Sequence, residues 1–97
     1  MNDKSLEDWR KQIDTLDEEL LNVLAKRINI VRKIGEFKKA RGISLLDEKR
    51  WQQILHSTLS KAKSLHLSQV FIEKLYNLIH EYTLEVEKNS KTTIDQK

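Results

Sequence analysis

The fold of this chain is decided by residues 6–41, which read LEDWRKQIDTLDEELLNVLAKRINIVRKIGEFKKAR. Apolar side chains recur there at alternating steps of three and four residues, the spacing of one long amphipathic helix. Nine of the ten positions in this apolar seam are hydrophobic, and the tenth is Arg27. The seam consists of Leu6, Trp9, Ile13, Leu16, Leu20, Val23, Arg27, Ile30, Ile34 and Phe37. Because a guanidinium cannot escape burial by losing its proton, Arg27 is a candidate ligand-binding residue.

The composition indicates one small all-α domain over residues 1–97, with no proline and only two glycines. The sequence has no cysteine, which excludes disulfides and thiolate chemistry. With no apolar run near the N-terminus, we expect a cytoplasmic protein without a signal peptide or membrane span. The net charge of +3 is spread over 18 basic and 15 acidic residues, which favours a small anionic ligand over nucleic acid.

The apolar periodicity predicts three helices, which span residues 6–41, 47–64 and 69–88. Residues 89–97 lose the periodicity and are expected to form a frayed tail. At 1.5 Å per residue the first helix is about 54 Å long, and the other two are about 26 and 32 Å. Two short helices cannot cover both sides of the long one, so the lengths predict an intertwined homodimer.

Local capping signals mark the ends of these helices. Ser5 with Asp8 resembles a capping box at the start of the first helix, and Gly42 is suited to close it. Asp47 is a plausible N-cap for the second helix and Ser68 for the third.

Several polar side chains are spaced so that they can meet in one cavity of the bundle. Lys38 lies eleven residues after Arg27, about 20° beyond three full turns, so the two share a face. Arg10 lies about 100° away around the same helix, so it can reach such a cavity only from a partner chain. The candidate set is Arg10, Arg27, Lys38, Asp47, Arg50, Thr83 and Glu87. Taken singly, each residue has an ordinary explanation: it could fix the register of helix packing, cap a helix or be a solvated surface charge.

Other chemistries are not indicated. His80 and Glu81 begin a zinc-protease motif, but position 84 is leucine where a second histidine is required. With Gly35 and Gly42 as the only glycines, the sequence has no phosphate-binding loop. We therefore expect no metal and no cofactor. Gly35, inside the first helix, predicts close packing or room for a ligand.

The order and spacing of these residues resemble the all-helical, AroQ-class chorismate mutases over nearly the whole chain. The resemblance is carried by Arg10, Ile13-Asp14, Leu16-Asp17, Lys26-Arg27, Ile34-Gly35, Lys38, Asp47, Arg50, Thr83 and Glu87. It implies a dimer of three-helix chains that rearranges chorismate to prephenate, on the route to phenylalanine and tyrosine, without covalent catalysis.

By position, the resemblance also implies roles for the candidate residues. Arg27 and the partner's Arg10 would hold the substrate carboxylates, with Arg50 and Thr83 assisting. Lys38 and Glu87 would hydrogen-bond the ether oxygen as its bond breaks. Asp47 would help to position the ring hydroxyl.

Two positions depart from the family pattern. Many members carry glutamine where this chain has Glu87, so Glu87 must be protonated to donate a hydrogen bond to the ether oxygen. Trp51 replaces a glutamate that accepts a hydrogen bond from the substrate hydroxyl, and an indole N–H only donates. That contact would be lost, or supplied by Asp47 or Gln52.

Three alternatives stay open at this point. The same fold and cationic pocket serve isochorismate-pyruvate lyases, and the Trp51 change also suits a mutase acting on 4-amino-4-deoxychorismate. A non-catalytic helical dimerisation module would use Arg27 only to set register. The chain is either free-standing or one domain of a fusion with a shikimate-pathway enzyme.

Overall fold

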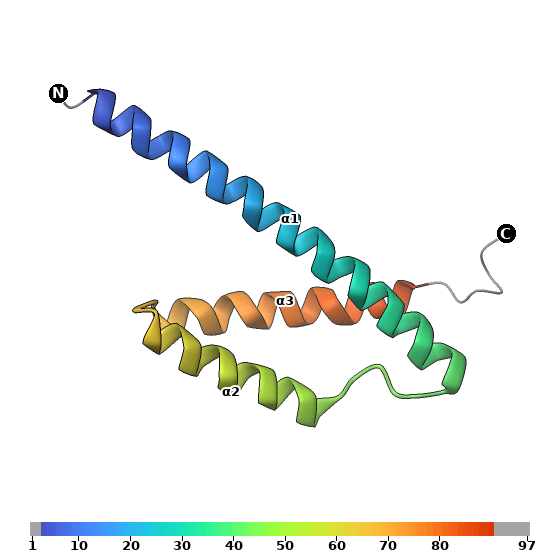
Figure 1. Ribbon diagram of the computed structural model, residues 1–97. Helices are drawn as coiled ribbons and strands as arrows, with labels where there is room; N and C mark the ends of the chain where they lie inside the picture. Colours follow the sequence, from blue (N-terminus) through green and yellow to red (C-terminus); the bar gives the residue numbers. More distant parts are fainter. Residues whose placement is uncertain (1–2, 91–97) are drawn as a thin grey trace, which may run out of the picture. The chain divides into compact units, whose positions relative to one another are not determined.

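The computed structural model describes residues 3–90, which form three α-helices and no strand (Figure 1). The helices are α1 (Asp3–Arg41), α2 (Glu48–Ser64) and α3 (Gln69–Asn89). The prediction of an all-α chain with one very long N-terminal helix is confirmed. The chain divides into two compact units, Met1–Ile30 and Val31–Lys97. The first contains most of α1, and the second contains the end of α1 together with α2 and α3.

The end of α1 is closed by Gly42, as predicted. Gly42 has a φ of +66°, the left-handed conformation that glycine adopts without strain. Its N–H donates to the Lys39 carbonyl at 3.3 Å, and the Ile43 N–H donates to the Lys38 carbonyl at 2.8 Å. This pair of bonds is a Schellman motif, which satisfies carbonyls that the helix end would otherwise leave without partners.

The start of α1 differs from the prediction. The helix begins at Asp3, so Ser5 lies inside it and does not cap it. No proline or glycine stands before Ser5 to stop the helix from continuing toward the N-terminus. The predicted capping box of Ser5 and Asp8 is therefore wrong.

The N-caps of α2 and α3 are confirmed. The Asp47 carboxylate accepts a hydrogen bond from the Arg50 backbone N–H at 3.0 Å, so Asp47 precedes α2 and is not part of it. The Ser68 hydroxyl oxygen accepts from the Phe71 N–H at 3.1 Å. Each side chain satisfies one of the free N–H groups at its helix start.

The end of α3 is more ordered than expected. Asn89 is its last residue, and Ser90 caps it with only 9% of its surface exposed. The Ser90 hydroxyl donates to the Val86 carbonyl at 2.7 Å, and Lys39 donates to the carbonyls of Lys88 and Ser90. Helix α3 thus ends one residue beyond the predicted residue 88, and these contacts hold Ser90 at its end. Residues 91–97 of that predicted tail lie outside the described part of the chain.

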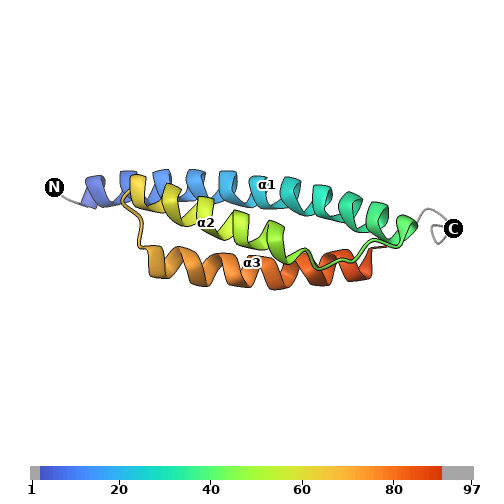
Figure 2. The ribbon, with the colours of Figure 1, turned by 90° about the horizontal axis from the view of Figure 1, so that it is seen from below.

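Helices α2 and α3 run side by side as an antiparallel hairpin in the second unit (Figure 2). Their connection is a second Schellman motif, with Leu67 donating to the Ala62 carbonyl at 2.9 Å. His66 occupies the left-handed position there, with a φ of 61°. Ala62 and Ile72, on the two sides of this turn, are among the few buried apolar residues of the described chain.

The apolar seam of α1 is open to solvent. All nine of its hydrophobic residues are exposed, from 41% at Ile34 to 62% at Trp9. Within residues 3–90 the buried hydrophobic residues are Val31, Ala62 and Ile72. The hydrophobic side chains of the α1 seam are therefore exposed in the single chain.

Candidate functional site

Lys38 is held at both its backbone and its side chain. Its carbonyl oxygen accepts the Ile43 N–H of the α1 C-cap. Its ammonium donates to the Leu45 carbonyl at 2.9 Å and to Glu87 Oε1 at 3.3 Å. The side chain is 17% exposed, so the end of α1 and the following loop present a fixed, partly buried cation.

Glu87 is the buried partner of this cation, with 5% of its surface exposed. It reaches Lys38 because Gly35 lets the two helices touch. A Cβ atom on Gly35 would lie 2.8 Å from Glu87 Cα and 2.9 Å from the Glu87 carbonyl oxygen, closer than real Cβ contacts. The prediction that Gly35 marks close packing is therefore confirmed.

The Lys38–Glu87 pair can receive an oxygen atom. An ammonium group has three N–H donors. Two of those on Lys38 have the partners already named, which leaves the third for a ligand. Glu87 accepts from Lys38 as a carboxylate, and it can donate to a ligand only when protonated. Because Glu87 is buried, Lys38 also offsets the cost of its charge.

The start of α2 brings Asp47 and Arg50 together through the capping hydrogen bond. Both side chains are exposed. One oxygen of the Asp47 carboxylate is therefore used by the helix itself. The interpretation of Asp47 as an N-cap is confirmed, and its role toward a ring hydroxyl stays a prediction.

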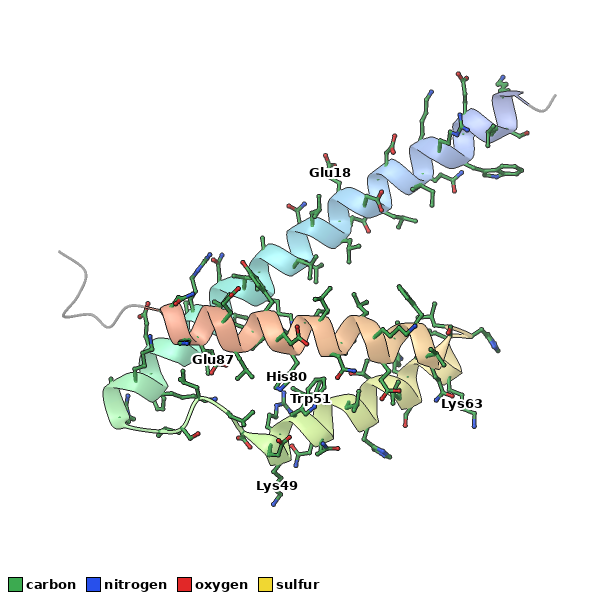
Figure 3. The ribbon with its side chains drawn as sticks, turned by 180° about the vertical axis from the view of Figure 1, so that it is seen from behind. Glu18, Lys49, Trp51, Lys63, His80 and Glu87 are labelled. Carbon is green, nitrogen blue, oxygen red and sulfur yellow. The ribbon has the colours of Figure 1, made fainter. Side chains whose placement is uncertain are left out.

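A stacked pair of rings beside these residues was not expected from the sequence. Trp51 of α2 and His80 of α3 stack with ring centroids 4.0 Å apart and planes inclined by 9° (Figure 3). The sequence signal that links His80 to the candidate site is its position seven residues before Glu87, which puts both on one face of α3.

The remaining candidates are divided between the two units. Arg10 and Arg27 belong to the N-terminal unit, where Arg10 is exposed and Arg27 is partly buried. Thr83 lies on α3 one turn before Glu87 and is partly buried. The structure thus brings Lys38 and Glu87 into contact and joins Asp47 to Arg50.

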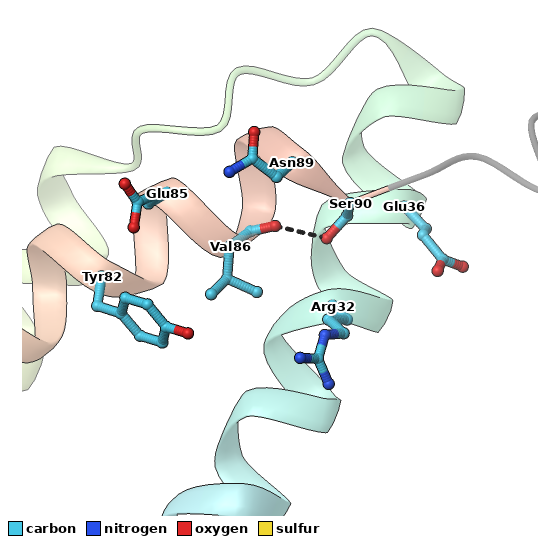
Figure 4. A pocket seen from close by; sticks show the side chains of 7 residues that line it. All are labelled: Arg32, Glu36, Tyr82, Glu85, Val86, Asn89 and Ser90. Carbon is cyan, nitrogen blue, oxygen red and sulfur yellow. Dashed lines mark hydrogen bonds between the residues drawn. The ribbon is translucent and has the colours of Figure 1, made fainter.

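Two pockets in the second unit lie away from these candidates. The first, of about 390 Å³, is a polar hollow between the end of α1 and the end of α3 (Figure 4). It is lined by Arg32, Glu36, Tyr82, Glu85, Val86, Asn89 and Ser90. The second, of about 340 Å³, lies at the α2–α3 turn, lined by Ser57, Thr58, Lys61, Ala62, Leu65, Leu67, Ile72 and Tyr76. Neither pocket includes a predicted site residue.

Residues 3–90 contain no cluster of three or more His, Asp or Glu side chains that could hold a metal ion. None of the three helices carries an apolar stretch long enough to cross a bilayer.

Comparison with known proteins gives consistent similarities. Residues 9–88 match the family described as Chorismate mutase type II. The T-protein of Enterobacter agglomerans is 34% identical over 85 residues, which cover 86% of this chain and 23% of that protein. The bifunctional chorismate mutase/prephenate dehydratase of Aquifex aeolicus is 29% identical over 91 residues, which cover 91% of this chain and 25% of that protein. The chain therefore spans about a quarter of the length of these relatives.

Proposed function

Because this chain belongs to the chorismate mutase type II family, we propose that it is an isomerase that rearranges chorismate to prephenate. The observation that carries the proposal is the contact between Lys38 and Glu87, a fixed cation and a buried carboxyl group within the matched residues. Both side chains lie at positions that the sequence resemblance assigns to the reacting oxygen.

The proposed mechanism needs no covalent step. The site holds the substrate in its compact conformer, which supplies the orientation that the free molecule rarely adopts. As the ether bond breaks, negative charge grows on the ether oxygen. The third N–H of Lys38 donates to that oxygen, and protonated Glu87 donates a second hydrogen bond. Fixed donors of this kind are worth about 10²- to 10³-fold each in rate.

The two substrate carboxylates are assigned to arginines. Arg27 interrupts an otherwise apolar seam and binds one of them, and the partner's Arg10 binds the other. Arg50 and Thr83 assist, and Asp47 helps to orient the ring hydroxyl. Guanidinium groups suit this role because they stay charged and bind carboxylates with two parallel hydrogen bonds.

The proposal requires a homodimer with two equivalent sites. The exposed seam supports it, because nine large apolar side chains in one row are unusual on a monomer's surface. Antiparallel packing of two α1 helices buries the seam and brings Arg10 of one chain to the site of the other. Light scattering on the purified protein is expected to give about twice the 11.5 kDa mass of one chain. A mass of 11.5 kDa would contradict the shared site.

Direct turnover assays test the proposed reaction. The purified chain is incubated separately with chorismate, isochorismate and 4-amino-4-deoxychorismate, and the products are identified by mass spectrometry. Prephenate from chorismate supports the proposal, whereas pyruvate released from isochorismate would identify a lyase. Turnover of 4-amino-4-deoxychorismate alone would identify a mutase for that substrate and would link Trp51 to its specificity. A dimer inactive on all three would be a dimerisation module.

The cellular role follows from the proposed activity. We place the chain in the cytoplasm, in the synthesis of phenylalanine and tyrosine. Relatives named as bifunctional enzymes join chorismate mutase to a second activity. They support a domain that works either alone or fused to another enzyme of the same pathway.

A further inference from the structure

The stacked Trp51–His80 pair has no part in the mechanism described so far. Trp51 lies in the first turn of α2, directly after Arg50, and His80 lies near the middle of α3. Their rings are nearly parallel at a centroid separation of 4.0 Å. Both residues are only partly buried, so the pair keeps an accessible side.

His80 shares a face of α3 with Glu87. Seven residues separate them, about 20° short of two turns and about 10.5 Å along the axis. Figure 3 shows both side chains extending from the side of α3 on which α2 lies. A ligand held at Glu87 and extending along α3 toward its N-terminus therefore meets the Trp51–His80 pair.

The stack leaves the edge of the imidazole ring for hydrogen bonding. Its nitrogens lie in the ring plane and not between the two faces. The hydrogen bonds found among residues 3–90 include neither of these nitrogens. A neutral imidazole offers one donor and one acceptor, whereas the indole of Trp51 offers only a donor. The acceptor in this pair is thus His80.

We propose that the Trp51–His80 pair is a wall of the substrate site and that an imidazole nitrogen of His80 accepts a hydrogen bond from the substrate's ring hydroxyl. This inference rests on the proposed function. The hydroxyl is borne by the ring carbon next to the ether carbon, so its oxygen lies about 3 Å from the ether oxygen. The separation of about 10.5 Å accommodates this distance together with one hydrogen bond of about 3 Å at Glu87 and one at His80.

The test compares two substrates and two ring variants of the full chain. His80→Phe keeps a flat ring for stacking and removes both nitrogens, and Trp51→Phe is the matched control that keeps both nitrogens. The substrates are chorismate and an analogue with hydrogen in place of the ring hydroxyl. His80→Phe is expected to lower kcat/KM for chorismate about five- to tenfold, the effect of one lost hydrogen bond, and to change the analogue's value less than about twofold. Trp51→Phe should affect both substrates equally.

A rescue experiment separates hydrogen bonding from packing. Adding Trp51→Glu to His80→Phe supplies a new acceptor and is expected to recover the preference for chorismate. Thermal unfolding and far-ultraviolet circular dichroism establish that each variant is folded. His80→Leu is the second variant without ring nitrogens, for use if His80→Phe does not fold.

Equal losses of kcat/KM on both substrates would show that the stack only packs α2 against α3, and would overturn the proposal. A wild-type chain inactive on chorismate would overturn the proposed function as well, so the two failures are distinguishable.

Discussion

The Cα atom of Glu87 lies 2.8 Å from the position that a Cβ atom on Gly35 would occupy. This approach of backbone to backbone joins the end of α1 to the end of α3. It also sets the distance of 3.3 Å between Lys38 Nζ and Glu87 Oε1. The glycine is therefore a structural requirement of the candidate catalytic pair.

Gly35→Ala is expected to destabilise the protein although alanine is the better helix former. Helix propensity alone would add about 1 kcal/mol of stability. The new methyl group meets backbone atoms, which cannot rotate away, and overpacking of this kind costs about 1–3 kcal/mol. We expect a net loss in urea unfolding at fixed protein concentration and a lower kcat. Ala40→Gly, at an exposed position of α1, measures the propensity effect alone. A Gly35→Ala protein more stable than wild type would contradict this packing.

Local sequence patterns predicted the helices well because their causes are local. The seam's alternating steps define α1, and Gly42, Asp47 and Ser68 each act on a backbone group within a few residues. The start of α1 was predicted too late because no proline or glycine before Ser5 ends the helix there. The buried Ser90 was missed because its position depends on a cation 51 residues away.

The candidate site was predicted only in part. The approach of Lys38 to Glu87 follows from the family resemblance, since no local rule pairs residues 49 positions apart. The stack of Trp51 on His80 depends on how α2 packs against α3, which periodicity does not specify. His66 has no sequence signature for its left-handed conformation, because that position is usually glycine.

Lys38→Met is expected to lower kcat about 10²- to 10³-fold, because it removes the donor to the ether oxygen. Lys33→Met, at an exposed position of the same helix, is the control and should leave kcat unchanged. The Lys38 change also leaves the buried Glu87 without its cation, which costs about 1–3 kcal/mol of stability. The double variant with Glu87→Gln should regain that stability without regaining the rate. Equal activity of the two lysine variants would remove Lys38 from the mechanism.

Glu87→Gln tests Glu87 as the second hydrogen-bond donor to the ether oxygen. An amide N–H donates without taking up a proton, so the glutamine variant is expected to keep the wild-type kcat or exceed it. Glu87→Ala removes the donor and should lower kcat about 10²- to 10³-fold. Equal activity of the glutamine and alanine variants would reject the proposed role of Glu87.

His66→Gly is expected to stabilise the protein by about 0.5–1 kcal/mol, because glycine adopts a positive φ without strain. Leu65→Gly is the matched control, since Leu65 has a φ of −95° and gains nothing from glycine. Chemical unfolding measures both, and turnover should stay at the wild-type value. A loss of stability in His66→Gly would contradict the Schellman motif at the α2–α3 turn.

Each site is proposed to take Arg27 from one chain and Arg10 from the other, and mixed dimers of two variants test this sharing. Arg10→Ala and Arg27→Ala are each expected to lower activity about 100-fold or more. When the two variant chains are refolded together, about half of the dimers are hybrids, and each hybrid has one intact site. The mixture should therefore recover about one quarter of the wild-type activity. A mixture no more active than the two variants measured separately would contradict a site shared between two chains.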